Sequence, residues 1–137
     1  MRYLGLDLGT KTLGVAVSDK TGLIATFYKN INYKDKEKLF EEILDIIKLE
    51  QIEKVILGLP KNMNNTIGER AESTIEFAKE LEEKINIEVL LEDERLTTKV
   101  AESALINANM SRKKRKKVID GVSAVIILQS YLDRKEK

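Results

Sequence analysis

The sequence predicts an α/β fold: a mixed five-stranded sheet, with three antiparallel strands followed by parallel strands, and helices on both faces. Two observations predict it. The first part of the chain consists of alternating apolar and polar runs joined by short turns, which is typical of hairpins. From residue 36 onward, stretches with helical periodicity alternate with short apolar runs, which is typical of parallel strands joined by helices. A chain of 137 residues suits one such domain, which we expect to span residues 1–137.

The first hairpin is predicted by the stretch GLDLGTKTLGVAVSD at residues 5–19. Residues 3–8 alternate, with leucines on one face and Asp7 on the other. Residues 9–12 contain a glycine and form the turn, and residues 13–18 repeat the alternation with small residues opposite larger ones. Asp7 should therefore lie on a sheet face whose neighbours are mostly small. An ionised carboxylate there is costly unless a cation, a metal or several donors hold it, so we interpret Asp7 as a metal ligand.

The remaining elements follow from periodicity. A third strand is expected at residues 23–28. The other predicted elements are helices at residues 36–49, about 71–81, about 98–107 and about 113–132, and strands at residues 54–59 and 88–91. In open sheets of this kind, functional residues gather at the carboxyl ends of strands. Asp7, Leu59-Pro60 and the pair Asp93-Glu94 all fall at or near such ends.

The composition excludes several kinds of chemistry. The chain has no cysteine and no histidine, so disulfides, thiolate metal sites, histidine zinc sites and Ser-His-Asp triads are all excluded. Any catalysis must rest on carboxylates, lysines, hydroxyls and bound ions. The net charge is only +1, so a basic surface has to be local. No apolar run reaches the roughly 20 residues of a membrane span and no signal peptide opens the chain, so we expect no membrane partner.

Acidic residues stand at three places that are distant in the sequence: Asp7, the pair Asp93-Glu94, and Asp120 within an almost entirely apolar helix. Each has an ordinary alternative. Asp93 or Glu94 could be a surface charge, and Asp120 could pair with Lys116, four residues earlier, for only about 0.2–0.5 kcal/mol. Together they could converge above the sheet. Oxygen ligands without nitrogen or sulfur suit Mg²⁺ or Mn²⁺, and carboxylates that hold such ions commonly serve phosphodiester hydrolysis.

A basic run opens the last predicted helix. It consists of six consecutive cations after Ser111, the expected N-cap: Arg112, Lys113, Lys114, Arg115, Lys116 and Lys117. Cations at a helix N-terminus oppose the helix dipole, so helix stability does not explain them, whereas phosphate binding does. Lys113 and Lys116 share a helix face with Asp120, so a bound backbone would be delivered to the carboxylates. The alternatives are a solvated charge run and a nuclear localisation signal. Aromatic residues make up 5% of the chain, so stacking on bases is not expected to dominate.

With these residues in place, the sequence resembles the YqgF/RuvX family of RNase H-like Holliday-junction resolvases, whose members are also described as pre-16S rRNA nucleases. The resemblance spans nearly the whole chain through four ordered motifs: GLDLGTKTLGVAVSD, GLPKNMNNT, LEDERLTT and SRKKRKKVIDGVSAVIILQSYL. One departure is Asn65, which stands where glycine usually follows NMN. The resemblance implies an RNase H-like fold and a metal-dependent nuclease of the bacterial cytoplasm.

The resemblance also implies the site residues and the partner. Asp7, Glu94 and Asp120 would be catalytic and would hold Mg²⁺ or Mn²⁺, with Asp93 in reserve as a metal ligand. We also assign Lys11, Arg95 and the six cations at residues 112–117 to nucleic-acid binding. The substrate would be pre-rRNA, at the 5′ end of pre-16S rRNA, or branched DNA. The protein would be a monomer or a homodimer, and resolving a four-way junction needs the two active sites of a symmetric dimer.

Two other classes of function stay open at this point. The segment DLGTKT resembles the phosphate loop of sugar kinases and actin-like ATPases, although those proteins normally need two lobes of this type and 137 residues supply one. A non-catalytic nucleic-acid-binding factor would use the basic helix without the acids. The substitution Asp7→Asn distinguishes such a binder from a nuclease, because only the nuclease depends on that carboxylate.

Overall fold

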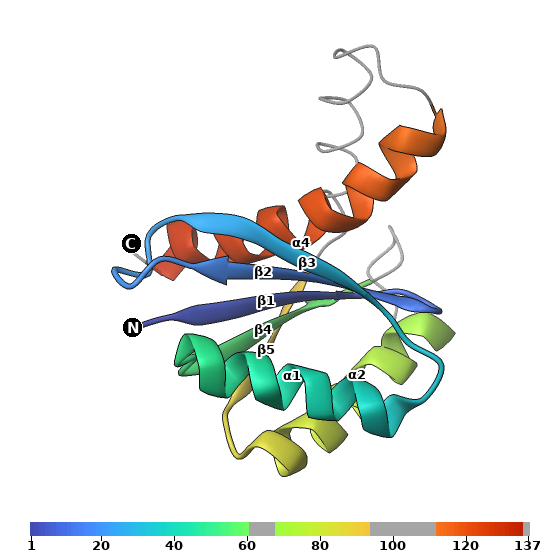
Figure 1. The fold of residues 1–137 in the computed structure, drawn as a ribbon, viewed down its shortest axis with the longest axis horizontal. Helices are drawn as coiled ribbons and strands as arrows, with labels where there is room; N and C mark the ends of the chain where they lie inside the picture. The colour runs from blue at the N-terminus through green and yellow to red at the C-terminus, as the bar shows by residue number, and fades with distance from the viewer. Residues whose placement is uncertain (61–67, 94–111, 136–137) are drawn as a thin grey trace.

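The computed structural model describes residues 1–60, 68–93 and 112–135, and it shows one sheet with helices on both faces (Figure 1). Its elements in chain order are β1 (Tyr3–Leu8), β2 (Thr12–Ser18), β3 (Ala25–Asn32), α1 (Lys36–Glu50), β4 (Lys54–Leu59), α2 (Glu69–Ile85), β5 (Val89–Asp93) and α4 (Arg112–Lys135). Within α4, side chains are described for residues 123–134. Among the helices described, none is both long and apolar enough to cross a membrane.

The sheet has the strand order β3-β2-β1-β4-β5. β1 pairs antiparallel with β2, and β2 pairs antiparallel with β3. β4 lies parallel to both β1 and β5, and the chain reaches these strands through α1 and α2. The predicted fold class, with three antiparallel strands followed by parallel ones, is therefore confirmed.

Two strands have other bounds than predicted: β3 spans Ala25–Asn32 instead of residues 23–28, and β5 spans Val89–Asp93 instead of residues 88–91. β3 starts at Ala25 rather than near Leu23, because the carboxylate of Asp19 accepts the backbone N–H groups of Leu23 and Ile24 and holds them in the preceding turn. β5 runs on through Glu92 and Asp93, because both residues stay paired with β4. The predicted helix at about 98–107 and the polar loop after Pro60 lie outside the described residues.

The face under α1 and α2 carries a large apolar core. Its cluster joins residues of both helices to the leucines and valines of the sheet, including Leu6, Leu13, Val15 and Leu57, all fully buried. Those residues occupy alternate strand positions, as the period of two requires. Phe40 and Phe77 bring the two helices together, with ring centroids 5.2 Å apart. The alternation of apolar residues in the sequence predicts such an apolar face.

The opposite face is covered by α4 and has a smaller core. It consists of Tyr3, Ala16, Ala25, Ile56, Ala124, Ile127, Leu128 and Leu132. α4 packs against β1, β2 and β3 and extends beyond the sheet at its N-terminal end (Figure 1). Among the described residues, one helix covers this side and two helices cover the other.

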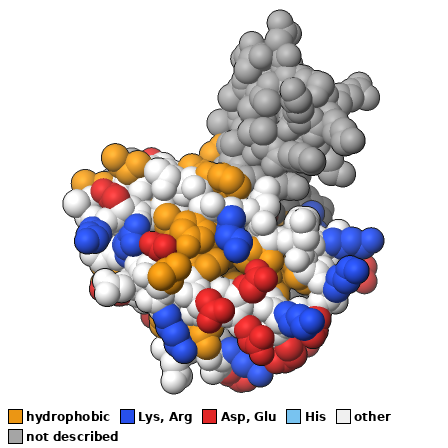
Figure 2. All heavy atoms as spheres, viewed as in Figure 1, with side chains coloured by type: hydrophobic (Ala, Val, Ile, Leu, Met, Phe, Trp, Pro, Cys, Tyr) orange, Lys and Arg blue, Asp and Glu red, His pale blue; other side chains and the backbone are white. Residues whose placement is uncertain are grey.

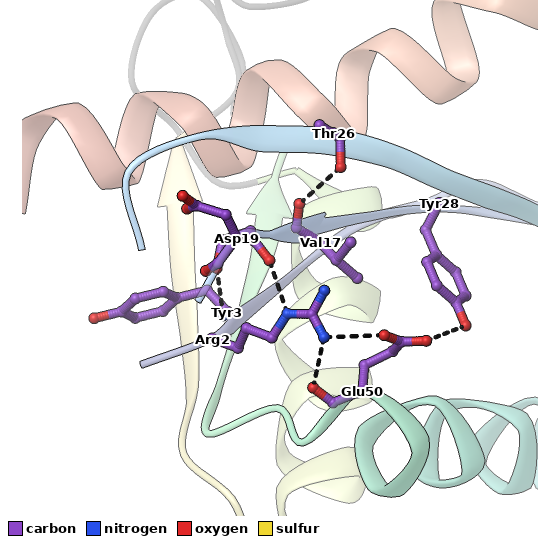
Figure 3. Close-up of polar contacts among 8 residues, drawn as sticks. Arg2, Tyr3, Val17, Asp19, Thr26, Tyr28 and Glu50 are labelled. Atoms are coloured by element: carbon purple, nitrogen blue, oxygen red, sulfur yellow. Dashed lines mark hydrogen bonds and ion pairs between the residues drawn. The ribbon is translucent and has the colours of Figure 1, made fainter. Parts of the chain in front are cut away.

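The amino-terminal end of β1 is fastened to α1 and β2 by a polar network (Figure 3). The guanidinium of Arg2 donates to the carbonyl of Ser18 and to both the carbonyl and the carboxylate of Glu50. The same carboxylate accepts the hydroxyl of Tyr28 at 3.0 Å. Burial, together with the neighbouring Glu50 carboxylate, raises the pKa of Tyr28. This network fixes the end of the sheet opposite to Asp7.

Candidate functional site

Asp7 lies near the carboxyl end of β1, on the face that α4 covers. It pairs with Gly14 of β2. On its other side, Leu6 is opposite Leu57, so the next positions along the two parallel strands, Asp7 and Gly58, are neighbours. Asp7 is half-buried, and neither cross-strand neighbour has a side chain that could cover it. The prediction that this carboxylate has small neighbours is confirmed.

Gly5 lets α4 rest directly on β1. A Cβ at this position would lie 2.6 Å from the Cβ of Leu128 and 3.1 Å from the carbonyl oxygen of Ala124, which is closer than a side chain tolerates. Three residues after Leu128 along the helix, the ring of Tyr131 packs against Tyr3 at the start of the strand, with centroids 5.8 Å apart. Later helix positions thus meet earlier strand positions, so α4 runs antiparallel to β1.

This direction relates the helix position of Asp120 to Asp7. Asp120 precedes Ala124 by about one turn, or about 6 Å along the axis, and shares its helix face. Asp7 follows Gly5 by two residues, or about 6.6 Å along the strand. Because α4 and β1 are antiparallel, going from Ala124 back to position 120 and going from Gly5 on to Asp7 lead in the same direction. The backbone of α4 therefore brings position 120 to the level of Asp7, while the Asp120 side chain lies outside the described part.

Two side chains of α4 fasten the helix to both edges of the sheet. The amide of Gln129 accepts the backbone N–H of Ala25 and donates to the carbonyl of Leu23, each at 2.8 Å, at the β3 edge. At the β5 edge, Arg134 Nη2 lies 2.7 Å from Glu92 Oε1. The helix that carries position 120 is thus held in place from both sides.

The acidic pair at the end of β5 divides between the two faces of the sheet. Glu92 is paired with Gly58, and Asp93 is paired with Leu59. Because strand side chains alternate, Glu92 lies on the same face as Asp7, and Asp93 lies on the face of α2. Glu94, the preferred ligand of the sequence prediction, lies outside the described residues.

Glu92 is the acidic residue that the sequence prediction missed. Its side chain is only 4% exposed, Oε1 is bound by Arg134, and Oε2 has no hydrogen-bond partner among the residues that the structure describes. The predicted strand at residues 88–91 ends one position before Glu92. Strand alternation, followed two residues beyond Leu90, was the signal that could have placed it on the buried face.

The predicted nucleic-acid-binding residues are described only in part. Lys11 is exposed in the turn between β1 and β2. This turn is held by Tyr33, whose hydroxyl donates to the carbonyl of Gly9 at 2.8 Å and whose pKa is raised by burial. The cations at 112–117 form the first residues of α4, with no acidic residue in its first turn. Their side chains and Arg95 lie outside the described part.

On the face of the molecule drawn in Figure 2, the described residues form no alternative basic surface. Figure 2 shows that acidic and basic side chains are interspersed there around a hydrophobic area. Mixed charge of this kind does not attract a phosphate backbone as a block of one sign does. The basic start of α4 therefore stays the preferred candidate.

The carboxylate of Asp7 is a ligand of the type that a hard cation such as Mg²⁺ or Mn²⁺ prefers. Asp7 provides carboxylate oxygen on a face lined by glycines, and oxygen ligands are what these ions prefer. Among the residues described, no three acidic side chains gather closely enough to hold a metal, and two of the three predicted ligand side chains lie outside that part. Of the four residues predicted as possible metal ligands, the structure describes the side chains of Asp7 and of the reserve ligand Asp93, which lie on opposite faces of the sheet.

The chain is similar to bacterial proteins along its whole length. One relative, named "Putative pre-16S rRNA nuclease" in Listeria monocytogenes serotype 4b, is 53% identical over 135 residues, covering 97% of this chain and 98% of the relative. A relative of the same name in Bacillus cytotoxicus is 48% identical over 137 residues, covering 98% of this chain and all of the relative.

Solved structures and a family model agree with this result. The fowlpox virus resolvase bound to Holliday junction DNA matches with a TM-score of 0.63 at 16% identity, covering all of both chains. Thermus thermophilus RuvC bound to a Holliday junction matches with a TM-score of 0.61 at 14% identity, covering 99% of this chain and 96% of the other. These matches show that the fold is the RNase H-like fold of RuvC-type resolvases. The model of the family described as "RuvX: Holliday junction resolvase" matches residues 1–134, and the chain belongs to that family.

Proposed function

We propose that this protein is a divalent-metal-dependent nuclease that hydrolyses phosphodiester bonds in structured nucleic acid, with the 5′ end of pre-16S rRNA as its substrate. The names of relatives about half identical over the full length support the substrate. The RNase H-like fold and the family support the reaction. We place the protein in the cytoplasm, where pre-rRNA is processed in bacteria.

Asp7, Glu94 and Asp120 would hold the cation. When bound there, Mg²⁺ or Mn²⁺ supplies a nucleophilic hydroxide from water and stabilises charge on the leaving oxygen. We favour Glu94 over Asp93 because Asp93 belongs to a strand position on the opposite face from Asp7.

The cations act on the substrate rather than on the bond itself. Residues 112–117 would contact the phosphates and lay the backbone along the start of α4, with Lys11 and Arg95 next to the acidic positions. Binding through phosphates neutralises several charges, so affinity should fall steeply with salt concentration. Such contacts position the substrate and carry no sequence information.

The observation that carries the proposal is the docking of α4 on β1 at Gly5. This contact supports the proposal because, by the spacing along both elements, the backbone of α4 reaches the level of Asp7 at position 120. A side chain at position 5 would push α4 away from β1. Position 120 would then lie farther from Asp7.

Asp7→Asn tests the proposal. The assay offers an RNA that contains the 5′ end of 16S rRNA with its precursor extension, with Mg²⁺, with Mn²⁺ or with EDTA. We expect metal-dependent cleavage by the wild-type protein, and a loss of at least about 100-fold for Asp7→Asn, since even outer-shell partners of a metal are worth 10–100-fold. Asp45→Asn, an exposed aspartate on α1, is the matched control and should retain activity.

Two results would contradict the proposal. Cleavage that persists in EDTA would exclude the metal, and equal activity of Asp7→Asn and Asp45→Asn would exclude the site. A protein that cleaves nothing but binds RNA through residues 112–117 would be the non-catalytic factor.

A second substrate is favoured by a specific observation: the family description and the fold neighbours are Holliday-junction resolvases. Cutting two strands of a four-way junction symmetrically requires two active sites, hence a homodimer. The same assay with a four-way DNA junction, combined with the mass of the protein in solution, decides between the substrates. Paired cuts in the junction by a dimer, with the RNA left intact, would favour the resolvase.

A further inference from the structure

A cavity of about 260 Å³ lies at the carboxyl end of β1, on the face opposite to Asp7. It is enclosed by the turn between β1 and β2, the start of α1 and the first turns of α2. Leu8 and Phe77 give it apolar walls, and Lys36 and Arg70 line it as well. Its lining, as far as the structure describes the chain, contains two cations and no carboxylate.

Both cations can turn to an anion. Arg70 Nη2 donates to the carbonyl of Leu8 at 3.2 Å, but a guanidinium has five N–H donors, so one bond does not exhaust it. Lys36 Nζ lies 3.4 Å from the carboxylate of Glu80, and both side chains are about half exposed. An exposed pair of this kind is weak, so a phosphate can compete for the lysine.

The N-terminus of α2 adds backbone donors beside Arg70. Its N-cap is Gly68, and in the described part of the chain no side chain caps its first N–H groups. α1 differs, because Asp35 accepts the N–H of Glu37 there. Uncapped N–H groups and the positive end of the helix dipole favour a bound anion. Glu69 and Glu72 in this turn are exposed and do not line the cavity.

The cavity and Asp7 are close along the chain but lie on opposite faces. Leu8 follows Asp7 directly, and consecutive strand side chains point to opposite sides of the sheet. Thr10, in the turn after the strand, also lines the cavity. A chain that passes around this turn can therefore reach both places.

We propose that this cavity, which we call the β1 pocket, binds one nucleotide of the nucleic-acid strand beside the cleaved bond. Its phosphate contacts Arg70, Lys36 and the first N–H groups of α2, and its sugar or base lies against Leu8 and Phe77. The volume is just below the roughly 300–1,000 Å³ of pockets for drug-sized ligands, which suits a single nucleotide. This inference rests on the proposed nuclease function and adds a second contact point for the same substrate.

Kinetics with three variants test the β1 pocket. Arg70→Gln removes one of the two cations that line it, and Ser73→Tyr places a bulky side chain at its wall from an exposed position on α2. Lys79→Gln removes an exposed cation of the same helix outside the pocket and is the matched control. We expect KM for RNA to rise about tenfold in Arg70→Gln, which is the size of one charge-assisted hydrogen bond, and to rise in Ser73→Tyr because its ring occupies the pocket, with kcat little changed in both variants. Thermal melting shows that each variant is folded.

Amide NMR spectra of the wild-type protein test binding directly and without cleavage. The probes are a 5′-phosphorylated dinucleotide, AMP and inorganic phosphate, in the absence of divalent metal. We expect the dinucleotide to shift the amide signals of Thr74 and Phe77, AMP to shift them more weakly, and phosphate to shift only the first turn of α2. Tighter binding of AMP than of the dinucleotide would overturn the assignment to a strand and indicate a free-nucleotide site.

The two proposals fail in different ways. If the wild-type protein cleaves RNA while Arg70→Gln and Ser73→Tyr match Lys79→Gln in KM, the β1 pocket is wrong and the nuclease stands. Absence of any shift at Thr74 and Phe77 with all three probes would also overturn the pocket. If the dinucleotide shifts these signals but no nucleic acid is cleaved, the pocket stands as a binding site and the proposed nuclease fails.

Discussion

The two faces of the sheet differ in what they bury. Under α1 and α2 lies a continuous core of leucine, isoleucine, valine and phenylalanine. Under α4 the cluster is smaller and includes three alanines, and the buried polar residues Ser18, Glu92 and Ser123 belong to strand and helix positions on this side. One strand thus contributes Leu6 to one face and Asp7 to the other.

This difference shows how a small fold separates stability from chemistry. Large apolar side chains on one face supply most of the hydrophobic stabilisation, at roughly 25 cal/mol per Å² of apolar surface buried. On the other face, Gly5 lets a helix approach closely, and Gly14 and Gly58 flank Asp7 without adding side chains. Substitutions on the two faces should therefore have different effects.

The largest effect on stability is expected from Leu6→Ala on the α1/α2 face. Leu6 is fully buried, so the cavity left behind should lower the free energy of unfolding by roughly 2–5 kcal/mol, as measured by urea denaturation. Cleavage activity per folded molecule should stay the same. Leu49→Ala, at a side chain that is 74% exposed, is the control and should change stability very little. A loss of activity in folded Leu6→Ala would show that the α1/α2 face also contributes to the chemistry.

Gly5→Ala on the α4 face should cost less stability and more activity. The added methyl group meets Leu128 and the backbone of Ala124, so we expect a loss of about 1–3 kcal/mol from overpacking. Because α4 must shift to make room, cleavage by the folded variant should fall well below that of folded Leu6→Ala. The check is to assay both variants well below their melting temperatures. Equal specific activities would show that the α4 contact does not position the site.

The buried carboxylate of Glu92 gives an intermediate effect. Arg134→Met leaves this group without its ion-pair partner, which should cost about 1–3 kcal/mol of stability. Replacing both residues with Glu92→Leu and Arg134→Met should recover most of this loss, because the double variant no longer buries a carboxylate without a partner. Urea denaturation of the wild type, the two single variants and the double variant gives the interaction energy of the two side chains as a double-mutant cycle. A strictly additive result would show that the two side chains do not interact.

The smallest effect on stability is expected from Asp19, which belongs to neither hydrophobic core. Hydrogen bonds from the Thr21 hydroxyl and from the backbone N–H groups of Ile24 and Leu23 lower its pKa from 3.8 to about 2. Since the folded pKa is the lower one, its contribution is complete above about pH 4 and is lost as the pH falls toward 2. Melting temperatures of wild type and Asp19→Asn should differ slightly at neutral pH and converge near pH 2. A difference that grows on acidification would contradict this assignment.

Part of the candidate site could be predicted from local patterns. The period of two placed Leu6 and Asp7 on opposite faces of β1, and the structure has them there. The same rule, had we extended it along β5, would have placed Glu92 inside. The β1 pocket could not be predicted, because Leu8, Lys36, Arg70 and Phe77 come from separate elements that only the folded chain brings together.

The sequence by itself determined the order of strands and helices, the antiparallel and parallel pairings, and the face of Asp7, because these follow from side-chain periodicity and connection length. Tertiary structure alone decided how closely α4 approaches β1, how Arg134 reaches Glu92 and where a cavity remains. These features depend on contacts between residues distant in the chain. No local pattern encodes such distances, since they are set by which side chains meet when the layers pack.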